Sequence, residues 1–129
     1  MKKRNAKLRI RTGTPTLKRA VTAFKIFHRL ADIWGLDANE RHCLLGFERA
    51  SADVGLSEAG VLRLSHLLNI YTHLHELLQE DMAANSWLKS PNDAPLFGGR
   101  SALALMCSGR LEDLQAVHEY LAGCCQGYW

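Results

Sequence analysis

The sequence predicts a small all-α protein. Apolar residues recur every three or four positions along most of the chain, which is the spacing of helices that bury one face. No segment alternates apolar and polar residues over five or more positions between turn residues, so strands are not indicated. The chain has 129 residues, of which 47% are apolar and 22% are charged. This is typical of one globular domain or of two helical halves that share a core.

Start and stop residues divide the first part of the chain into helices. A helix is predicted over residues 17–34, because the Thr-Pro-Thr sequence at 14–16 is a start signal and Gly35 is a stop signal. Asp37 and Glu40 then form a capping-box pattern, in which each side chain bonds the free backbone N–H of the other residue. A short second helix is therefore expected directly after a tight corner.

The middle of the chain is expected to hold a long helix between shorter ones. Residues 47–54 are expected to add one or two helical turns, and Ser57 is a cap residue for the long helix over residues 58–78. Another short helix is expected over residues 81–88. It ends before residues 90–95, where two prolines lack the N–H groups that a helix uses, so a loop is predicted there.

Two more helices are expected near the C-terminus. Ser101 is a cap residue for a helix that ends near Gly109, and the final helix is expected to run from Leu111 toward Gly123. The glycine-rich stretch at 98–100 offers N–H groups that suit an anion. It follows no predicted strand and lacks a phosphate-binding motif, so a loop that leads into a capped helix is the favoured interpretation.

The charge is distributed unevenly along the chain. Residues 1–19 contain eight Lys or Arg and no acidic residue, which leaves eight basic and thirteen acidic side chains, a charge of 8 − 13 = −5, in residues 20–129. A basic arm on an acidic body is typical of proteins that contact nucleic acid with one end and a protein with the body. A solvated leader explains the same pattern. The candidate phosphate contacts are Lys2, Lys3, Arg4, Lys7, Arg9 and Arg11.

The cysteines and histidines show no spacing typical of a disulfide framework or a metal site. Two cysteines are adjacent at 124–125, and the other two lie among apolar residues. His73 and His75 point to different faces of a helix, and no two histidines stand at the i, i+4 spacing of a helical zinc site. We therefore expect reduced thiols, no metal ligands and no cofactor.

The sequence also argues against an enzyme and against a membrane protein. It offers no combination of nucleophile, base and orienting residue, and its acidic pairs stand where helices are predicted to start. The longest unbroken apolar run has six residues, whereas a membrane span needs about 20 and a signal peptide about 7 to 15. A non-enzymatic protein of the cytoplasm is expected.

Motifs in both halves of the chain resemble those of Xre/MbcA/ParS-like antitoxins. In this chain, the motifs that resemble the helix-turn-helix half of the family are Ile-Trp-Gly-Leu at 33–36, Glu40, Leu-Leu-Gly at 44–46 and the stretch 63–71. The resemblance to the toxin-binding half of the family is more specific. It is carried by residues at 87–88, 91–92, 97–103, 105–106, 108–111 and 113–114, followed by Val117, Tyr120 and Leu121. The similarity covers residues 20–123 in the family's order.

The resemblance implies a type II antitoxin that binds and neutralises a RES-domain toxin, an enzyme that consumes NAD. Such antitoxins cover the active site of the toxin with their C-terminal part, and many repress their own operon as homodimers bound to operator DNA. The expected organisation is a basic flexible arm at 1–15, a helix-turn-helix-like half at 16–80 and a toxin-binding half with a C-terminal tail at 81–129. The alternative is a DNA-binding transcriptional regulator without a toxin partner.

The resemblance also selects candidate contact residues. Trp87 is expected to pack beneath the loop that follows it. The tail carries two aromatic residues, which either fold back on the protein or anchor it to a partner. Arg49 is the only basic residue in the shortened segment 47–56, where the family carries its recognition helix. The candidate toxin-binding residues are Trp87, Pro91, Asn92, Phe97, Gly98, Gly99, Arg100, Ser101, Gly109, Arg110, Tyr128 and Trp129.

Overall fold

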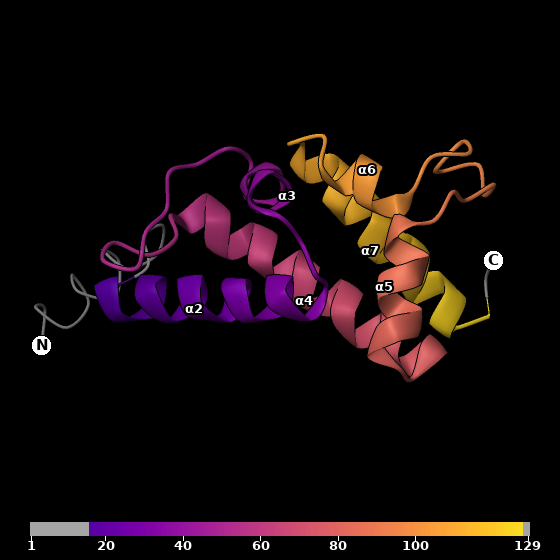
Figure 1. Ribbon diagram of the computed structural model, residues 1–129, viewed down its shortest axis with the longest axis horizontal. Coiled ribbons are helices and arrows are strands. Elements are labelled where there is room, and N and C mark those ends of the chain that lie inside the picture. Colours follow the sequence, from indigo (N-terminus) through magenta and orange to yellow (C-terminus); the bar gives the residue numbers. More distant parts are fainter. Residues whose placement is uncertain (1–15, 128–129) are drawn as a thin grey trace, which may run out of the picture.

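The computed structural model describes residues 16–127, which form helices joined by turns and loops without a strand (Figure 1). The predicted all-α class is confirmed. In chain order the helices are α2 (Leu17–Ile33), α3 (Ala38–Leu44), α4 (Glu58–Leu78), α5 (Asp81–Lys89), α6 (Ala102–Met106) and α7 (Leu111–Cys125). None of them is both long and apolar enough to cross a lipid bilayer. Outside the described residues lie the candidates Lys2, Lys3, Arg4, Lys7, Arg9, Arg11, Tyr128 and Trp129.

The predicted cap residues begin the helices as expected. The side chains of Thr16, Ser57 and Ser101 each accept a hydrogen bond from the backbone N–H three residues later, over 3.0 to 3.2 Å. Asp37 and Glu40 form both bonds of the capping box, of 2.7 and 2.9 Å. These side chains satisfy N–H groups that the first turn of a helix leaves unpaired, and they fix where α2, α3, α4 and α6 start.

The segment between α3 and α4 differs from the prediction, because residues 47–54 form no helical turns. Phe47 adopts a left-handed backbone, with a φ of 66°, and this ends the helical path. The carboxylate of Glu48 then accepts hydrogen bonds from the backbone N–H and the hydroxyl of Ser57, over 3.0 and 2.5 Å. Glu48 is thus held beside the N-terminus of α4, where a negative charge is stabilising. Tertiary contacts at α4 replace the expected local helix.

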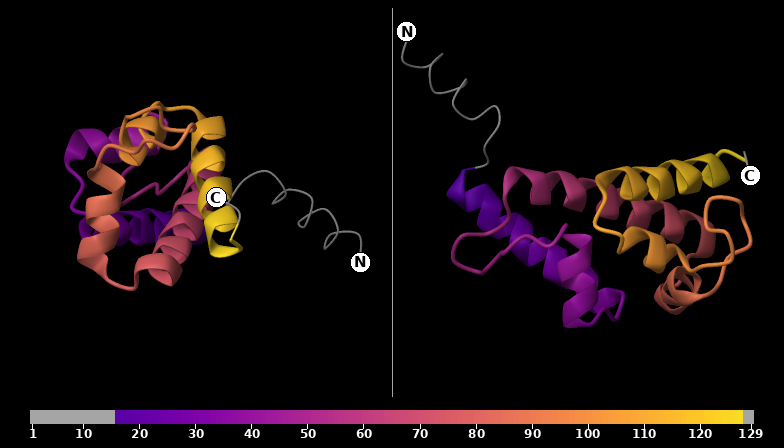
Figure 2. Two further views of the ribbon diagram at one scale, coloured as in Figure 1. Left: turned by 90° about the vertical axis from the view of Figure 1, so that its right-hand side faces the viewer. Right: turned by 90° about the horizontal axis from the view of Figure 1, so that it is seen from above.

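Helix α4 is the central element of the fold (Figure 1). Helices α2 and α7 both pack against it, and α7 lies alongside it in both views of Figure 2. The contacts His66 to His118 and His73 to Cys125 advance together along both helices, so α4 and α7 run parallel. Helix α7 extends to Cys125, beyond the expected end near Gly123. The connection through α5 and α6 therefore carries the chain back along α4.

The two halves of the chain share one apolar core. Trp34 is fully buried at the corner between α2 and α3, and the buried side chains around it form one cluster that continues through α4 to α7. All four cysteines are free thiols, as predicted. Burial, followed by the neighbouring Cys43, raises the pKa of the Cys107 thiol to about 12, so this thiol stays protonated and unreactive.

Candidate functional site

The loop between α5 and α6 is fixed by hydrogen bonds within the loop. The backbone N–H of Asn92 donates to the carbonyl of Arg100, and its backbone carbonyl accepts from the N–H of Gly99, over 3.1 and 2.8 Å. The side-chain Oδ1 of Asn92 accepts from the N–H of Ala94 over 2.9 Å. Asn92 therefore ties the two ends of the loop together, and its role is to hold the loop in shape.

Phe97 anchors this loop in the core. Its side chain is 3% exposed and contacts the edges of two aromatic rings, Trp87 on α5 at 5.8 Å and Tyr120 on α7 at 5.2 Å between ring centroids. Edge-to-face contacts at these distances are favourable. Trp87 itself is only half-buried. Trp87 thus packs against the loop through Phe97, while part of its own ring stays exposed.

The outer edge of the loop is formed by Gly98, Gly99 and Arg100, which are all exposed. Both glycines have a positive φ, of 58° and 89°, and a Cβ atom built on either would meet nothing within 4 Å. The N–H groups of all three residues donate to carbonyls of the same loop. They are not available to hold an anion, so the interpretation as a loop that leads into a capped helix is supported.

Among residues 16–127, the guanidinium of Arg100 makes no hydrogen bond or ion pair. Pro91 is exposed beside it, paired through its backbone with Ser101. An arginine in this position carries five donors that are directed at solvent. The loop therefore presents a fixed backbone, two exposed glycines and, beside them, an arginine that has no partner among the described residues. Such a surface suits a protein partner better than a small substrate.

The turn between α6 and α7 lies at the other end of α6 (Figure 1) and has a different character. Gly109 has a φ of 87°, and a Cβ atom there would lie 2.5 Å from the Phe47 ring. Its carbonyl accepts a hydrogen bond of 2.6 Å from Nη2 of Arg63 on α4. Gly109 thus has an internal packing role. Arg110 beside it is exposed, and its Nε lies 3.8 Å from Asp113.

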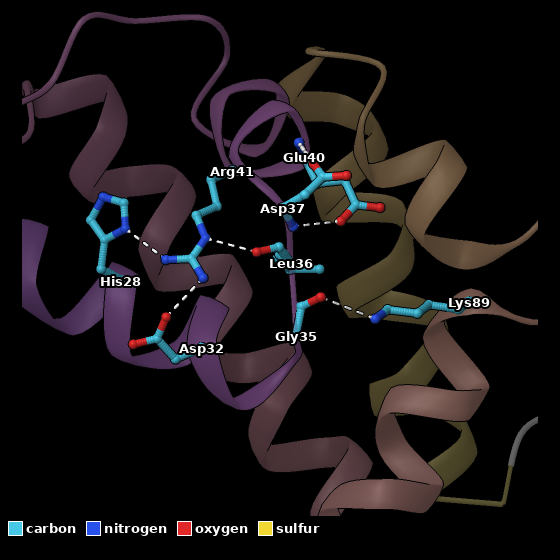
Figure 3. Close-up of polar contacts among 8 residues, drawn as sticks. All are labelled: His28, Asp32, Gly35, Leu36, Asp37, Glu40, Arg41 and Lys89. Atoms are coloured by element: carbon cyan, nitrogen blue, oxygen red, sulfur yellow. Dashed lines mark hydrogen bonds and ion pairs between the residues drawn. The ribbon is translucent and has the colours of Figure 1, made fainter.

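A corner of polar contacts holds α5 against the connection between α2 and α3 (Figure 3). Lys89 at the end of α5 donates to the carbonyl of Gly35 over 3.2 Å, and Asn85 donates to the carbonyl of Ile33 over 2.9 Å. In the same corner, Arg41 donates to the carbonyl of Leu36 over 3.0 Å. The loop is therefore mounted on a base that includes both halves of the chain.

The structure divides the sequence-derived candidates into supports and exposed groups. Asn92, Phe97, Ser101 and Gly109 hold the loop, the helix cap or the turn, and Trp87 supports Phe97 while leaving part of its ring exposed. The exposed candidates form two patches at opposite ends of α6. The loop patch consists of Pro91, Gly98, Gly99 and Arg100, and the turn patch consists of Arg110 together with Phe47.

Phe47 was missed by the sequence analysis. It is 51% exposed, and its ring covers Gly109 across a large separation in sequence. A helical turn was expected at 47–54. The polarity of a residue and its neighbours on a helix does not show that its side chain contacts a residue far away in the sequence. The Leu-Gly-Phe sequence that follows the capped α3 was the available signal, since a glycine after a helix marks its end.

The candidate DNA-reading segment has no recognition helix. Residues 45–57 separate α3 from α4 and contain no helix. Arg49 is exposed in this segment. Its neighbour Glu48 is committed to Ser57.

These features define a small helical protein with a fixed, exposed loop between α5 and α6. A sequence model of the antitoxin Xre/MbcA/ParS C-terminal toxin-binding domain matches residues 73–125, and the chain belongs to this family. The chain is also similar to the uncharacterized protein y4oB of Sinorhizobium fredii (strain NBRC 101917 / NGR234), with 36% identity over 110 residues that cover 80% of this chain and 84% of the relative. It is therefore an antitoxin of a toxin-antitoxin system, and its partner is a toxin.

Proposed function

We propose that the chain neutralises a RES-domain, NAD-consuming toxin by covering its active site, and that the loop patch makes the first contact. The observation that carries this proposal is the loop itself, with its backbone N–H groups satisfied internally and its outer edge open. A preformed loop loses little conformational entropy when it binds, so more of the interaction energy appears as affinity. Binding alone accounts for this activity, and the chain needs no chemistry of its own.

Arg100 is the proposed specific contact. Its planar guanidinium donates to carboxylates in pairs of parallel hydrogen bonds, and the described part of the chain offers it no such partner. We therefore expect an acidic or carbonyl-lined rim on the toxin opposite Arg100. The glycines next to it permit the backbone of the toxin to approach closely.

The test uses the product of the reading frame beside the antitoxin gene as the toxin. Arg100→Ala is expected to weaken its binding at least about tenfold in calorimetry, because a charge-assisted contact is lost. Arg29→Ala, at an exposed arginine on α2, is the matched control and is expected to bind like the unaltered chain. Equal binding by both variants would remove the loop patch from the interface. If the toxin does not consume NAD, the RES class is wrong, but the contact proposed for Arg100 is still tested by the binding measurement.

The aromatic end of the chain is the proposed second contact. The rings of Tyr128 and Trp129 resemble the aromatic base of NAD in chemistry, so these two residues are proposed to reach into the cleft of the toxin. Because α7 extends to Cys125, the informative truncation is after Gly127, which leaves this helix complete. Recovery of NAD consumption with the truncated antitoxin would support the plug. Full inhibition by the truncated antitoxin would show that the helices block the active site of the toxin without Tyr128 and Trp129.

Operon repression as a homodimer is a separate proposal that rests on the charge of the N-terminal arm. Residues 1–19 carry eight basic and no acidic side chains, and phosphate contacts of this kind position a protein without reading sequence. Deletion of residues 2–11 is expected to weaken binding to all DNA sequences and to flatten its salt dependence, by about 0.9 in slope for each lost contact. Toxin neutralisation is expected to survive the deletion. An unchanged salt dependence would contradict the DNA role of the arm.

A further inference from the structure

Three side chains with metal-binding atoms meet between α4 and α7, away from the α5–α6 loop. His73 and Glu76 lie one turn apart on α4, and Cys125 is the last residue of α7. Their ligand atoms all lie within 4.8 Å of one another. The spacing of residues along one helix does not indicate this site, because its third group comes from a second helix. We propose that His73, Glu76 and Cys125 form a zinc site.

The distances between these atoms match those between the ligands of zinc. His73 Nδ1 lies 3.0 Å from Glu76 Oε1, and Cys125 Sγ lies 3.6 Å from the former and 3.7 Å from the latter. A point equidistant from all three atoms is about 2.0 Å from each, which is close to the lengths of zinc bonds to nitrogen, oxygen and sulfur. The ion therefore fits with shifts of a few tenths of an ångström.

The chemistry of the three groups selects zinc among the common divalent ions. Imidazole and thiolate are ligands that zinc prefers over magnesium and calcium, which bind oxygen atoms almost exclusively. A thiolate and a carboxylate together neutralise the double positive charge. Three protein ligands leave the fourth tetrahedral position to water, and the Glu76 side chain, 57% exposed, keeps the site open to solvent.

A neighbouring histidine supports the orientation of the His73 ring. The ring of His118 on α7 stacks on that of His73, with 5.6 Å between centroids and 29° between planes. His118 is held in turn by a contact of 3.0 Å between its Nδ1 and that of His66. A ring that is already held in place by packing loses less conformational entropy when it binds an ion.

The position of the site in the chain gives the metal a structural role. His73 and Cys125 are the first and the last residues matched by the toxin-binding domain of the family. A metal that joins them closes the whole domain into one loop, and constraints on long loops reduce the entropy of the unfolded chain most. Zinc would thus fasten the binding domain without touching the loop patch, so this inference is independent of how the toxin is bound.

Cobalt titration of the reduced, untagged full chain tests the site directly. One equivalent of Co²⁺ is expected to give the visible bands of tetrahedral cobalt and a thiolate-to-cobalt charge-transfer band, both of which Zn²⁺ removes. Cys125→Ser is expected to abolish the charge-transfer band. Glu76→Gln is expected to weaken Zn²⁺ binding at least about tenfold, since even loss of a supporting group costs that much.

Cys124→Ser is the matched control, because the thiol of Cys124 lies beside Tyr120 instead of His73. This variant is expected to keep both bands. Zn²⁺ is also expected to raise the Tm of the unaltered chain but not that of Cys125→Ser, because a ligand that binds only the folded state stabilises it. No bands with the unaltered chain, or equal bands with Cys125→Ser, would overturn the proposal and leave the three groups as a hydrogen-bonded cluster.

Discussion

Gly55 in the segment between α3 and α4 and Gly98 in the α5–α6 loop both have a left-handed backbone, with φ of 75° and 58°, but they face different surroundings. A Cβ atom at Gly55 would overlap the backbone of Ala20, whereas one at Gly98 would meet nothing within 4 Å. In the first segment the absence of a side chain lets the chain contact itself. In the loop it leaves a surface free. The comparison teaches that a glycine signals function only once its neighbours are known.

The largest expected loss of stability comes from replacing a tryptophan, and the loss is expected to differ between Trp34 and Trp87. Trp34 is fully buried where α2 meets α3, and Trp34→Ala is expected to cost about 3 to 5 kcal/mol of unfolding free energy. Trp87 is half-buried against Phe97, so Trp87→Ala is expected to cost less than about 3 kcal/mol. Urea unfolding followed by circular dichroism measures both. Equal losses would mean that Trp87 supports the core as fully as Trp34 does.

The glycines themselves give the next largest effect. Gly55→Ala combines a strained φ with overlap of the Ala20 backbone and is expected to cost about 2 to 4 kcal/mol. Gly98→Ala carries only the strain of its φ, about 1 to 2 kcal/mol. Thermal unfolding compares the two variants. Weaker toxin binding by Gly98→Ala would show that the exposed surface of the loop contacts the toxin. Unfolding of Gly109→Ala would show that Gly109 is needed for packing of the turn.

A smaller effect concerns pH and the N-terminal half alone. Partial burial, followed by the nearby charge of Arg41, lowers the pKa of His28 below 6.5, while Asp32 acts in the opposite direction. The Nη1 of Arg41 lies 3.1 Å from the His28 ring nitrogen, so the neutral ring accepts from the guanidinium (Figure 3). The unfolded chain thus binds a proton more readily. The stabilisation is complete above pH 6.5 and is lost as pH falls through the lower pKa of the folded state.

Unfolding titrations between pH 7.5 and about pH 5 check this effect. The His28→Asn variant keeps a hydrogen-bond acceptor without a titrating ring, so it is expected to lose less stability on acidification than the unaltered chain. The same slope for both proteins would assign the acid sensitivity to other groups. Toxin binding by the loop patch is expected to be equal in the two proteins at neutral pH.

Local signals made the helices predictable, and distant contacts limited the prediction of the rest. The cap residues Thr16, Ser57 and Ser101 act within one helical turn, so their sequence positions were enough to place α2, α4 and α6. The segment 47–54 has helical spacing as well. Its conformation depends on Glu48 reaching Ser57 and on the N–H of Leu56 donating to the carbonyl of Ala20, which no local pattern contains.

The candidate site was predictable as a stretch of chain but not as a surface. The resemblance placed most of the candidate toxin-binding residues between Trp87 and Arg110, a stretch that the family match covers, whereas the candidates Tyr128 and Trp129 lie beyond the match. It did not separate Phe97, which is buried, from Arg100, which is exposed, because both belong to one continuous motif. Nor did it indicate Phe47, whose partner Gly109 follows far along the chain.

The parallel course of α4 and α7 has a consequence for how the protein is made. Contacts between these helices join residues 52 positions apart, such as His66 with His118. On a ribosome that adds about 5 to 20 residues per second, α4 therefore waits several seconds for α7, and the part of its surface that α7 covers stays exposed during that time. The binding loop gains its base only when α7 has emerged. A chain interrupted before α7 would carry every residue of the loop patch but would lack the ring of Tyr120, on which Phe97 of the loop packs.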